Sequence, residues 1–223
     1  MISLISVCYD RQPMLDKTLP LWLSQTADIE ILLAVGPDIK RIEHPKVKYY
    51  NAPGKWDFMK IAGCQLCASF NLLWQRAKGE QIFITYSDMA MPNTEHLAIM
   101  IKSWKPGRMV THSLGEMDCG IWTHGMLVDR KLIEKSGGWD TFYDGGWAYE
   151  DSDFVSGLLA AGGELHVLKE LKENGLYHID HPRPPDDANK GQKYYRNKCH
   201  YHAKHPDTVM HKRNRGEFPH HAE

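Results

Sequence analysis

The chain has 223 residues, of which 42% are hydrophobic and 25% charged, and its 27 Lys and Arg nearly balance 28 Asp and Glu. At about 150 residues per domain, this length favours one well-packed domain. The charge balance provides no general basic surface for nucleic acid, and the near-average composition excludes a disordered or disulfide-scaffolded protein. The sequence contains no run of 18 apolar residues, so it predicts no membrane span.

The cysteines and the N-terminus both favour a cytoplasmic protein. Five cysteines at irregular spacings are an odd number, which favours reduced thiols in an intracellular compartment. The opening residues lack the basic segment that begins a signal peptide, and they have the apolar pattern of a strand.

The first hundred residues alternate between short apolar runs and helical patterns. The runs predict strands, and apolar residues spaced three and four apart predict helices. Strands are expected at residues 2–8, 29–35, 47–50 and 81–86, and helices at about 14–23, 59–77 and 93–104. Such alternation is typical of an α/β domain whose mainly parallel, twisted sheet carries helices on both faces.

In a sheet of this kind the ligand lies beyond the carboxyl ends of the strands. The loops that follow the first, second and fourth predicted strands should therefore line one site. These loops carry the polar residues Asp10, Arg11, Asp38 and Asp88.

The second half of the chain is less regular. A strand is expected at residues 120–128, helices at 129–135 and 150–161, and a strand at 165–168. The prolines between residues 182 and 185 break regular structure. Residues from 186 onward are polar and rich in Lys, Arg and His, which predicts either a solvated helix or a cationic surface for an anionic acceptor.

An acidic cluster begins the helix expected at residue 150. Three of four consecutive residues, Glu150, Asp151 and Asp153, are acidic, and they follow a Gly-Gly-Trp turn at residues 145–147. One carboxylate is enough to cap a helix N-terminus. The surplus of acids favours a functional role, with simple capping as the alternative.

Two residues elsewhere have the chemistry of metal ligands. Asp88 follows an apolar strand, where a carboxylate suits a divalent cation or a ligand hydroxyl, although it could simply form the turn before the next proline. His178 belongs to the segment Tyr-His-Ile-Asp-His at residues 177–181, and neutral histidine is the commonest metal ligand. With 13 histidines in the chain, most are surface residues, so only its place after the last predicted strand distinguishes His178.

Five short sequence motifs occur in order along residues 5–154. They are Ile-Ser-Val-Cys-Tyr-Asp-Arg at residues 5–11, Asp-Ile-Glu-Ile-Leu-Leu at 28–33, Ala-Ser-Phe-Asn to Ala-Lys-Gly-Glu at 68–80, Gly-Gly-Trp-Asp at 137–140 and Tyr-Glu-Asp-Ser-Asp-Phe at 149–154. In this order they resemble the motifs of GT-A-fold glycosyltransferases of the large family-2 type. The first three resemble the family's opening strand with its Tyr-Asn-Arg turn, its second strand, and its helix with the Arg-Asn and Ala-x-Gly motifs. The last two resemble its Gly-Gly-Phe-Asp and Glu-Asp-x-Asp-Leu signature. The last two motifs are the most specific.

The region after the acidic motif is also similar to galactosyltransferases. His178 lies 27 residues after Asp151, in the order and approximate spacing of the metal-binding histidine of galactosyltransferase-like members. The resemblance covers residues 1–182. It implies a single GT-A, Rossmann-like domain with a nucleotide-sugar half at 1–112 and an acceptor or catalytic half at 113–182, followed by a basic extension at 183–223.

The resemblance implies an enzyme that moves a sugar from a nucleotide-diphosphate donor to an acceptor hydroxyl. The first expectation for the donor is a UDP-sugar, and the acceptor would belong to a glycan, a lipid or a nucleic acid. Asp151 would be the base that takes the acceptor proton, with inversion at the sugar carbon, and Glu150 would bind the acceptor. Asp88 and His178 would hold Mn²⁺ or Mg²⁺.

The remaining assignments follow from the same resemblance. Nucleotide-sugar contacts are expected from Asp10, Arg11, Asp38, Asn71 and Asp88, and acceptor or sugar contacts from Trp139, Trp147 and Asp153. The basic segment at about residues 186–204 would fold over the bound diphosphate.

Three departures from the family pattern keep an alternative open. Tyr86-Ser87-Asp88 has one acid where the family has Asp-x-Asp, residues 35–38 replace the Asp-Asp-Gly-Ser turn, and Gly157 lies near the position of the usual arginine. The alternative is a noncatalytic GT-A-like module that binds a sugar or a nucleotide. The intact acidic motif favours the enzyme, because a binding module needs no base.

Overall fold

The computed structural model describes residues 1–54, 65–112, 123–145, 148–168, 171, 175–181 and 188–206. Its strands are β1 (Ile2–Cys8), β2 (Ile29–Val35), β3 (Val47–Asn51), β4 (Gln81–Ile84), β5 (Met89–Ala90), β6 (Arg108–His112), β7 (Met126–Asp129), β8 (Glu164–Leu168) and β9 (Tyr177–His178). Its helices are α1 (Gln12–Leu23), α2 (Leu66–Arg76), α3 (His96–Ser103), α4 (Arg130–Ser136), the 3-10 helix η1 (Thr141–Tyr143), α5 (Glu150–Ala160) and α6 (Ala188–Lys204).

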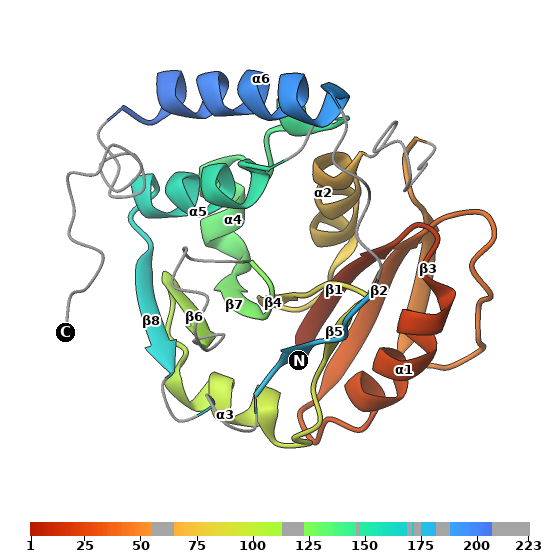
Figure 1. The fold of residues 1–223 in the computed structure, drawn as a ribbon. Coiled ribbons are helices and arrows are strands. Elements are labelled where there is room, and N and C mark those ends of the chain that lie inside the picture. The colour runs from red at the N-terminus through yellow and green to blue at the C-terminus, as the bar shows by residue number, and fades with distance from the viewer. Residues whose placement is uncertain are drawn as a thin grey trace.

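A seven-stranded sheet runs through the centre of the molecule in the order β3-β2-β1-β4-β7-β6-β8 (Figure 1). Strands β3, β2, β1 and β4 are parallel, and β8 is parallel to β6. Strand β7 is inserted between β4 and β6 and is antiparallel to both. The expectation of a mainly parallel α/β sheet is confirmed, with one antiparallel strand that joins the two halves of the chain.

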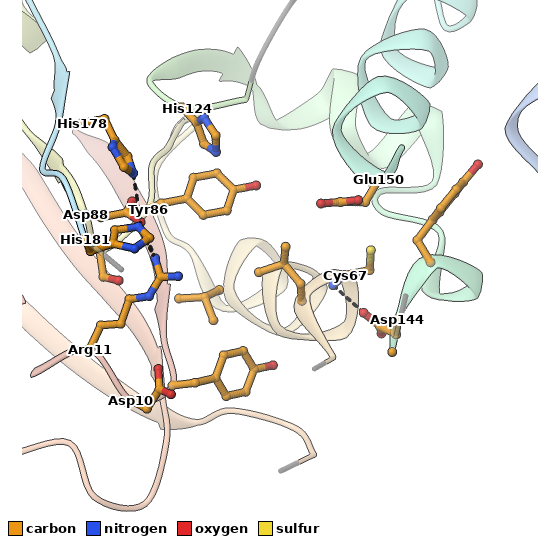
Figure 2. Close-up of a pocket in the computed structure, with 16 residues that line it drawn as sticks. Asp10, Arg11, Cys67, Tyr86, Asp88, His124, Asp144, Glu150, His178 and His181 are labelled. Atoms are coloured by element: carbon orange, nitrogen blue, oxygen red, sulfur yellow. Dashed lines mark hydrogen bonds and ion pairs between the residues drawn. The ribbon is translucent and has the colours of Figure 1, made fainter. Parts of the chain in front are cut away.

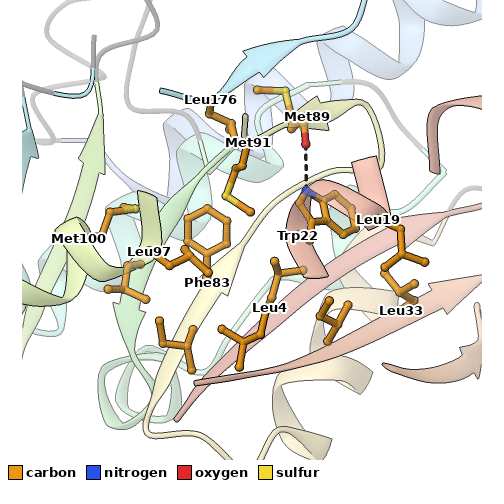
Figure 3. Close-up of a cluster of buried hydrophobic side chains, with 14 of the residues drawn as sticks. Leu4, Leu19, Trp22, Leu33, Phe83, Met89, Met91, Leu97, Met100 and Leu176 are labelled. Carbon is orange, nitrogen blue, oxygen red and sulfur yellow. Dashed lines mark hydrogen bonds between the residues drawn. The ribbon is translucent and has the colours of Figure 1, made fainter. Parts of the chain in front are cut away.

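Residues on successive positions of the central strands alternate between two apolar cores. In β1, Ile2 and Leu4 belong to the core under α1 and α3, whereas Ile5 and Val7 belong to the core under α2, α4 and α5. This alternation follows from the two-residue period of a strand and explains why every residue of β1 is buried, Ser3 and Ser6 included. Figure 3 shows the first of these cores, in which the Trp22 indole donates to the Met89 carbonyl at 3.0 Å.

Most of the expected elements are present, with ends that differ by a few residues in either direction. Residues 120–122 of the strand expected at 120–128 lie outside the described residues. The helix expected at 59–77 is α2 over Leu66–Arg76, and residues 59–64 of that prediction lie outside the described residues. Strand β6 was not anticipated, because its five residues become a strand through pairing with β7 and β8, which are distant in sequence. None of the helices in the described ranges is long and apolar enough to cross a bilayer.

The polar segment near the C-terminus forms a long helix, α6, which lies along α5 (Figure 1). Tyr201 is fully buried in the second core, and its hydroxyl lies 3.0 Å from the hydroxyl of Ser156 on α5. Lys204 bonds to Asp140 and Asp153, at 2.9 and 3.0 Å. Helix α6 is therefore packed against the domain, and Lys204 contacts one acidic residue on α5 and another in the segment before it.

Two buried histidines make the stability of the fold depend on pH. The His96 ring lies on α3 with no hydrogen-bond partner among the described residues, 5.4 Å from the ring of the buried His112. Burial lowers the pKa of His96 to about 3 and that of His112 to about 4, from 6.5. Both rings are therefore neutral in the folded protein over a pH range in which the unfolded chain would protonate them.

We predict that the free energy of unfolding is highest above pH 6.5 and falls as the pH decreases toward 4. In that window the unfolded state binds more protons than the folded state, and one pKa unit corresponds to about 1.4 kcal/mol. Urea unfolding between pH 4 and 8 measures this slope. His96→Leu should flatten it, whereas Leu97→Ala should lower stability without changing the slope; equal slopes in wild type and His96→Leu would contradict the prediction.

Candidate active site

A cavity of about 280 Å³ opens beyond the carboxyl ends of β1 and β4 (Figure 2). Asp10 and Arg11 reach it from the end of β1, and Asp88 from the turn after β4. The second half of the chain contributes Glu150. Its other lining residues are Val7, Tyr9, Leu66, Cys67, Tyr86, Ser87, His124, Tyr143, Asp144, Gly145, His178 and His181.

A two-residue pairing brings histidines to Asp88. Strand β9 pairs antiparallel with β5, with His178 opposite Met89, and the Ile179 amide donates to the Asp88 carbonyl at 2.8 Å. As a result, Nε2 of His178 and Nε2 of His181 lie 3.6 and 3.1 Å from Oδ2 of Asp88. One ligand atom from each of the three residues lies within 4.8 Å of the others, which makes them a candidate metal centre.

The chemistry of this group suits a divalent transition ion. Two imidazole nitrogens and one carboxylate oxygen fit Mn²⁺ better than Mg²⁺, which prefers oxygen ligands. Arg11 lies against the same group, with its guanidinium 2.5 Å from Oδ2 of Asp88 and 3.0 Å from Nε2 of His181. A metal ion and Arg11 would therefore both contact the carboxylate of Asp88. Their two positive charges together would attract an anionic ligand.

The other end of the cavity is acidic. Glu150 begins α5 and faces the cavity, and Asp144 lies nearby, where its carboxylate accepts the backbone amides of Cys67 and Ala68 at the start of α2 (Figure 2). Burial, followed by the negative charge of Asp151, raises the pKa of Glu150 to about 8. Glu150 is thus a carboxyl that can carry its proton at neutral pH.

Asp151 is partly exposed beside the cavity without being one of its lining residues, and two hydroxyl groups bond to its carboxylate. Oδ1 of Asp151 accepts from the Tyr86 hydroxyl at 3.0 Å and from the Thr123 hydroxyl. Tyr86 itself lines the cavity between the two ends, edge-on to His124 at 4.1 Å between ring centroids. Burial and the charges of Asp151 and Glu150 raise the pKa of Tyr86 well above its usual value, so the phenol keeps the proton that it donates.

Several residues expected at the site have structural contacts instead. Trp139 is buried between Phe70 and Phe154, with ring centroids 4.9 and 3.6 Å away, and it does not line the cavity. Asn71 bonds to both the backbone amide and the carbonyl of Trp139, at 3.0 and 2.8 Å. A Cβ at Gly138 would lie 2.6 Å from Oδ1 of Asn71, which explains the glycine before this tryptophan.

The remaining predicted residues divide similarly. Asp153 is buried on the inner side of α5, where it accepts from Tyr143 and contacts Lys204 and His205. Asp38 is exposed in the loop after β2 and is not part of the cavity lining. Trp147 lies outside the described residues.

Two residues of the site are not among those predicted from the sequence: His181, a third potential ligand, and Tyr86, which links the two ends of the cavity. The His-x-x-His spacing of residues 178 and 181 was the available signal for the former. For Tyr86 the sequence shows only that an acid of the family's metal motif is missing, because a phenol that bonds to a carboxylate 65 positions away has no local pattern.

Solved structures with a similar fold include glycosyltransferases. The mannosyltransferase PcManGT from Pyrobaculum calidifontis, in complex with GDP-Man and Mn²⁺, matches with a TM-score of 0.63 and 15% identity over 93% of this chain and 64% of that chain. Residues 1–349 of S. aureus TarS, in complex with UDP-GlcNAc, match with a TM-score of 0.65 and 12% identity over 93% and 67%. The catalytic domain of Drosophila β1,4-galactosyltransferase 7, in complex with xylobiose, matches with a TM-score of 0.57 and 15% identity over 86% and 79%.

The chain therefore has the GT-A glycosyltransferase fold, as the sequence motifs predicted. It spans about two thirds of the length of the mannosyltransferase and TarS chains. By sequence, no protein-family model and no functionally described protein matches it.

We predict that the chain binds Mn²⁺ through Asp88, His178 and His181. Loss of a residue that only hydrogen-bonds to a metal ligand typically weakens metal affinity ~10–100-fold. Removing one of the three ligands should weaken Mn²⁺ affinity by more than this. Electron paramagnetic resonance of Mn²⁺ titrated into wild type, Asp88→Asn and His181→Ala measures this. His44→Ala, a substitution in the loop before β3, is the control, and an unchanged affinity in His181→Ala would exclude that residue as a ligand.

Proposed function

We propose that the chain is a metal-assisted, inverting glycosyltransferase that moves a sugar from a nucleotide-diphosphate donor to an acceptor hydroxyl. One observation carries the proposal: a single cavity has the candidate metal centre and Arg11 at one end and the acidic start of α5 at the other. The similar structures support it, since they were solved with GDP-Man and Mn²⁺, with UDP-GlcNAc and with xylobiose. In this proposal the donor is a UDP- or GDP-type sugar and the acceptor is a glycan.

The donor diphosphate would bind at the end formed by Asp88, His178 and His181. When bound there, Mn²⁺ would neutralise the charge that develops on the leaving diphosphate. Arg11 lies 2.5 Å from Asp88 and can add a bidentate contact to phosphate oxygens. Asp10, beside it in the cavity wall, would contact the nucleoside part of the donor.

The acceptor would bind between Tyr86 and the start of α5. Asp151 would take the proton of the attacking hydroxyl; because both of its hydroxyl partners bond to Oδ1, we assign Oδ2 as the accepting atom. Glu150, with its raised pKa, would present a protonated carboxyl to an acceptor oxygen. Attack from this end, opposite the diphosphate, inverts the sugar carbon and gains rate from the fixed orientation of both partners.

A noncatalytic sugar- or nucleotide-binding module is the second candidate. The observation that favours it is the sequence Tyr86-Ser87-Asp88, in which one acid of the family's metal motif is missing. Such a module would bind donors yet neither transfer nor hydrolyse them, so turnover distinguishes the two.

We predict that a panel of UDP- and GDP-sugars with Mn²⁺ contains at least one that the wild type hydrolyses slowly or transfers to an acceptor glycan, and that EDTA stops this. Asp151→Asn should lower the rate by ~10²–10⁴, because an amide cannot accept the proton, while donor affinity changes only a few-fold. Calorimetric binding together with nucleotide release measures both quantities. Donor binding without release in the whole panel would support the binding module.

We predict that the KM for the acceptor rises as the pH passes through about 8, where Glu150 loses its proton. The negative carboxylate can no longer donate to the acceptor and repels the charge of Asp151. Glu150→Gln keeps a neutral donor, so its KM should stay flat up to pH 9, whereas Glu150→Ala should raise KM at every pH. A rate that instead increases through pH 8 and disappears in Glu150→Gln would make Glu150 the base.

A further inference from the structure

The acidic motif follows two residues in an unfavourable backbone conformation. Ala148 and Tyr149 have φ values of 63° and 74°, and they are the only non-glycine residues with positive φ in the described part of the chain. Residues with a Cβ rarely adopt this left-handed conformation, and it persists only where surrounding contacts hold it. Tyr149 is the N-cap of α5, so its backbone angles set the direction in which Glu150 and Asp151 leave the turn.

The contacts that hold these two residues come from α6. The side-chain amide of Asn197 donates to the Ala148 carbonyl at 3.0 Å, and the hydroxyls of Tyr149 and Tyr194 lie 3.1 Å apart. Asn197 is fully buried, and its own carbonyl oxygen accepts from Arg196 at 2.8 Å. A fully buried amide that bonds to a strained backbone carbonyl is placed to fix that carbonyl.

Ion pairs also hold the C-terminal end of α6 to residues on both sides of Ala148 and Tyr149 in the chain, and Lys204 takes part on each side. Before the strained pair, Lys204 and His200 lie 2.9 and 3.0 Å from Oδ2 of Asp140. After it, Asp153 on α5 contacts Lys204 at 3.0 Å and His205 at 2.8 Å, and Asp153 and His205 are both buried. These anchors keep Asn197 over Ala148 and restrain both segments that flank the turn.

We propose that Asn197 is a positioning residue for the acidic motif: through its bond to Ala148, α6 holds the turn in its left-handed conformation. In that conformation Glu150 faces the cavity, and the carboxylate of Asp151 accepts hydrogen bonds from the hydroxyls of Tyr86 and Thr123. Asn197 itself touches neither donor nor acceptor in this arrangement. The inference rests on the proposed glycosyltransferase function where turnover is measured, but its effect on the turn can be measured without any substrate.

The test compares Asn197→Ala with Asn197→Ala/Ala148→Gly. Loss of the amide should lower kcat at least tenfold while the KM for the donor and the affinity for Mn²⁺ change less than twofold, and hydrogen exchange should increase at residues 148–153. Glycine adopts positive φ without a Cβ penalty, so the added Ala148→Gly should restore most of kcat and of the protection. Lys198→Ala, on the neighbouring position of α6, is the control and should match wild type in every measurement.

Three results would overturn the proposal: unchanged exchange at residues 148–153 in Asn197→Ala, a loss of donor affinity as large as the loss of kcat, or no recovery in the double variant. If Asn197→Ala fails to fold, Tyr194→Phe, which removes only the hydroxyl contact to Tyr149, should show a smaller change in the same direction, and equality with wild type would overturn it. Should the wild type transfer no sugar, the proposed function fails, whereas the exchange comparison still decides whether Asn197 holds the turn.

Discussion

The short pairing of β5 with β9 is the constraint on which the donor end of the site depends. Strand β5 has only two residues, but its Met89 carbonyl is fixed by the indole of Trp22 in the core. With that strand held, the register that sets His178 opposite Met89 brings His178 and His181 to Asp88. One such hydrogen bond contributes only about 1 kcal/mol, so the ligand geometry relies on the packing of the whole core beneath it.

Tyr86 connects this end of the cavity to the other. It follows β4, two positions before Asp88, and its hydroxyl reaches Asp151 at the start of α5. Its ring packs edge-on against Phe70 and His124, with centroids 5.4 and 4.1 Å away, which fixes the direction of the hydroxyl. At the position of the family's other metal-binding acid, this chain thus has the neutral phenol of Tyr86, which donates to Asp151. His181 provides a further potential metal ligand at the donor end.

The sequence predicted what depends on local pattern and missed what depends on distant partners. The apolar run at residues 2–8 and the acids at Glu150 identified β1 and the start of α5, because each has its own periodicity or capping chemistry. Strand β6 has no such pattern and exists through its pairing with β7 and β8. Trp139 was expected at a sugar because it flanks the acidic motif, yet stacking between two phenylalanines buries it, and a motif alone cannot distinguish the two roles.

The two ends of the cavity are built by different means, and this bears on how each could vary. The donor end depends on the two-residue pairing of the exposed strand β9 with the buried strand β5, which belongs to the core. The acceptor end begins at the strained pair Ala148 and Tyr149, whose conformation is held by side chains of α6, such as Asn197. Local rules are commonly broken at functional sites and compensated elsewhere, and here the compensation is a separate C-terminal helix. Substitutions on the inner face of α6 could therefore reorient Glu150 and Asp151 while Asp88 and its histidines stay in place.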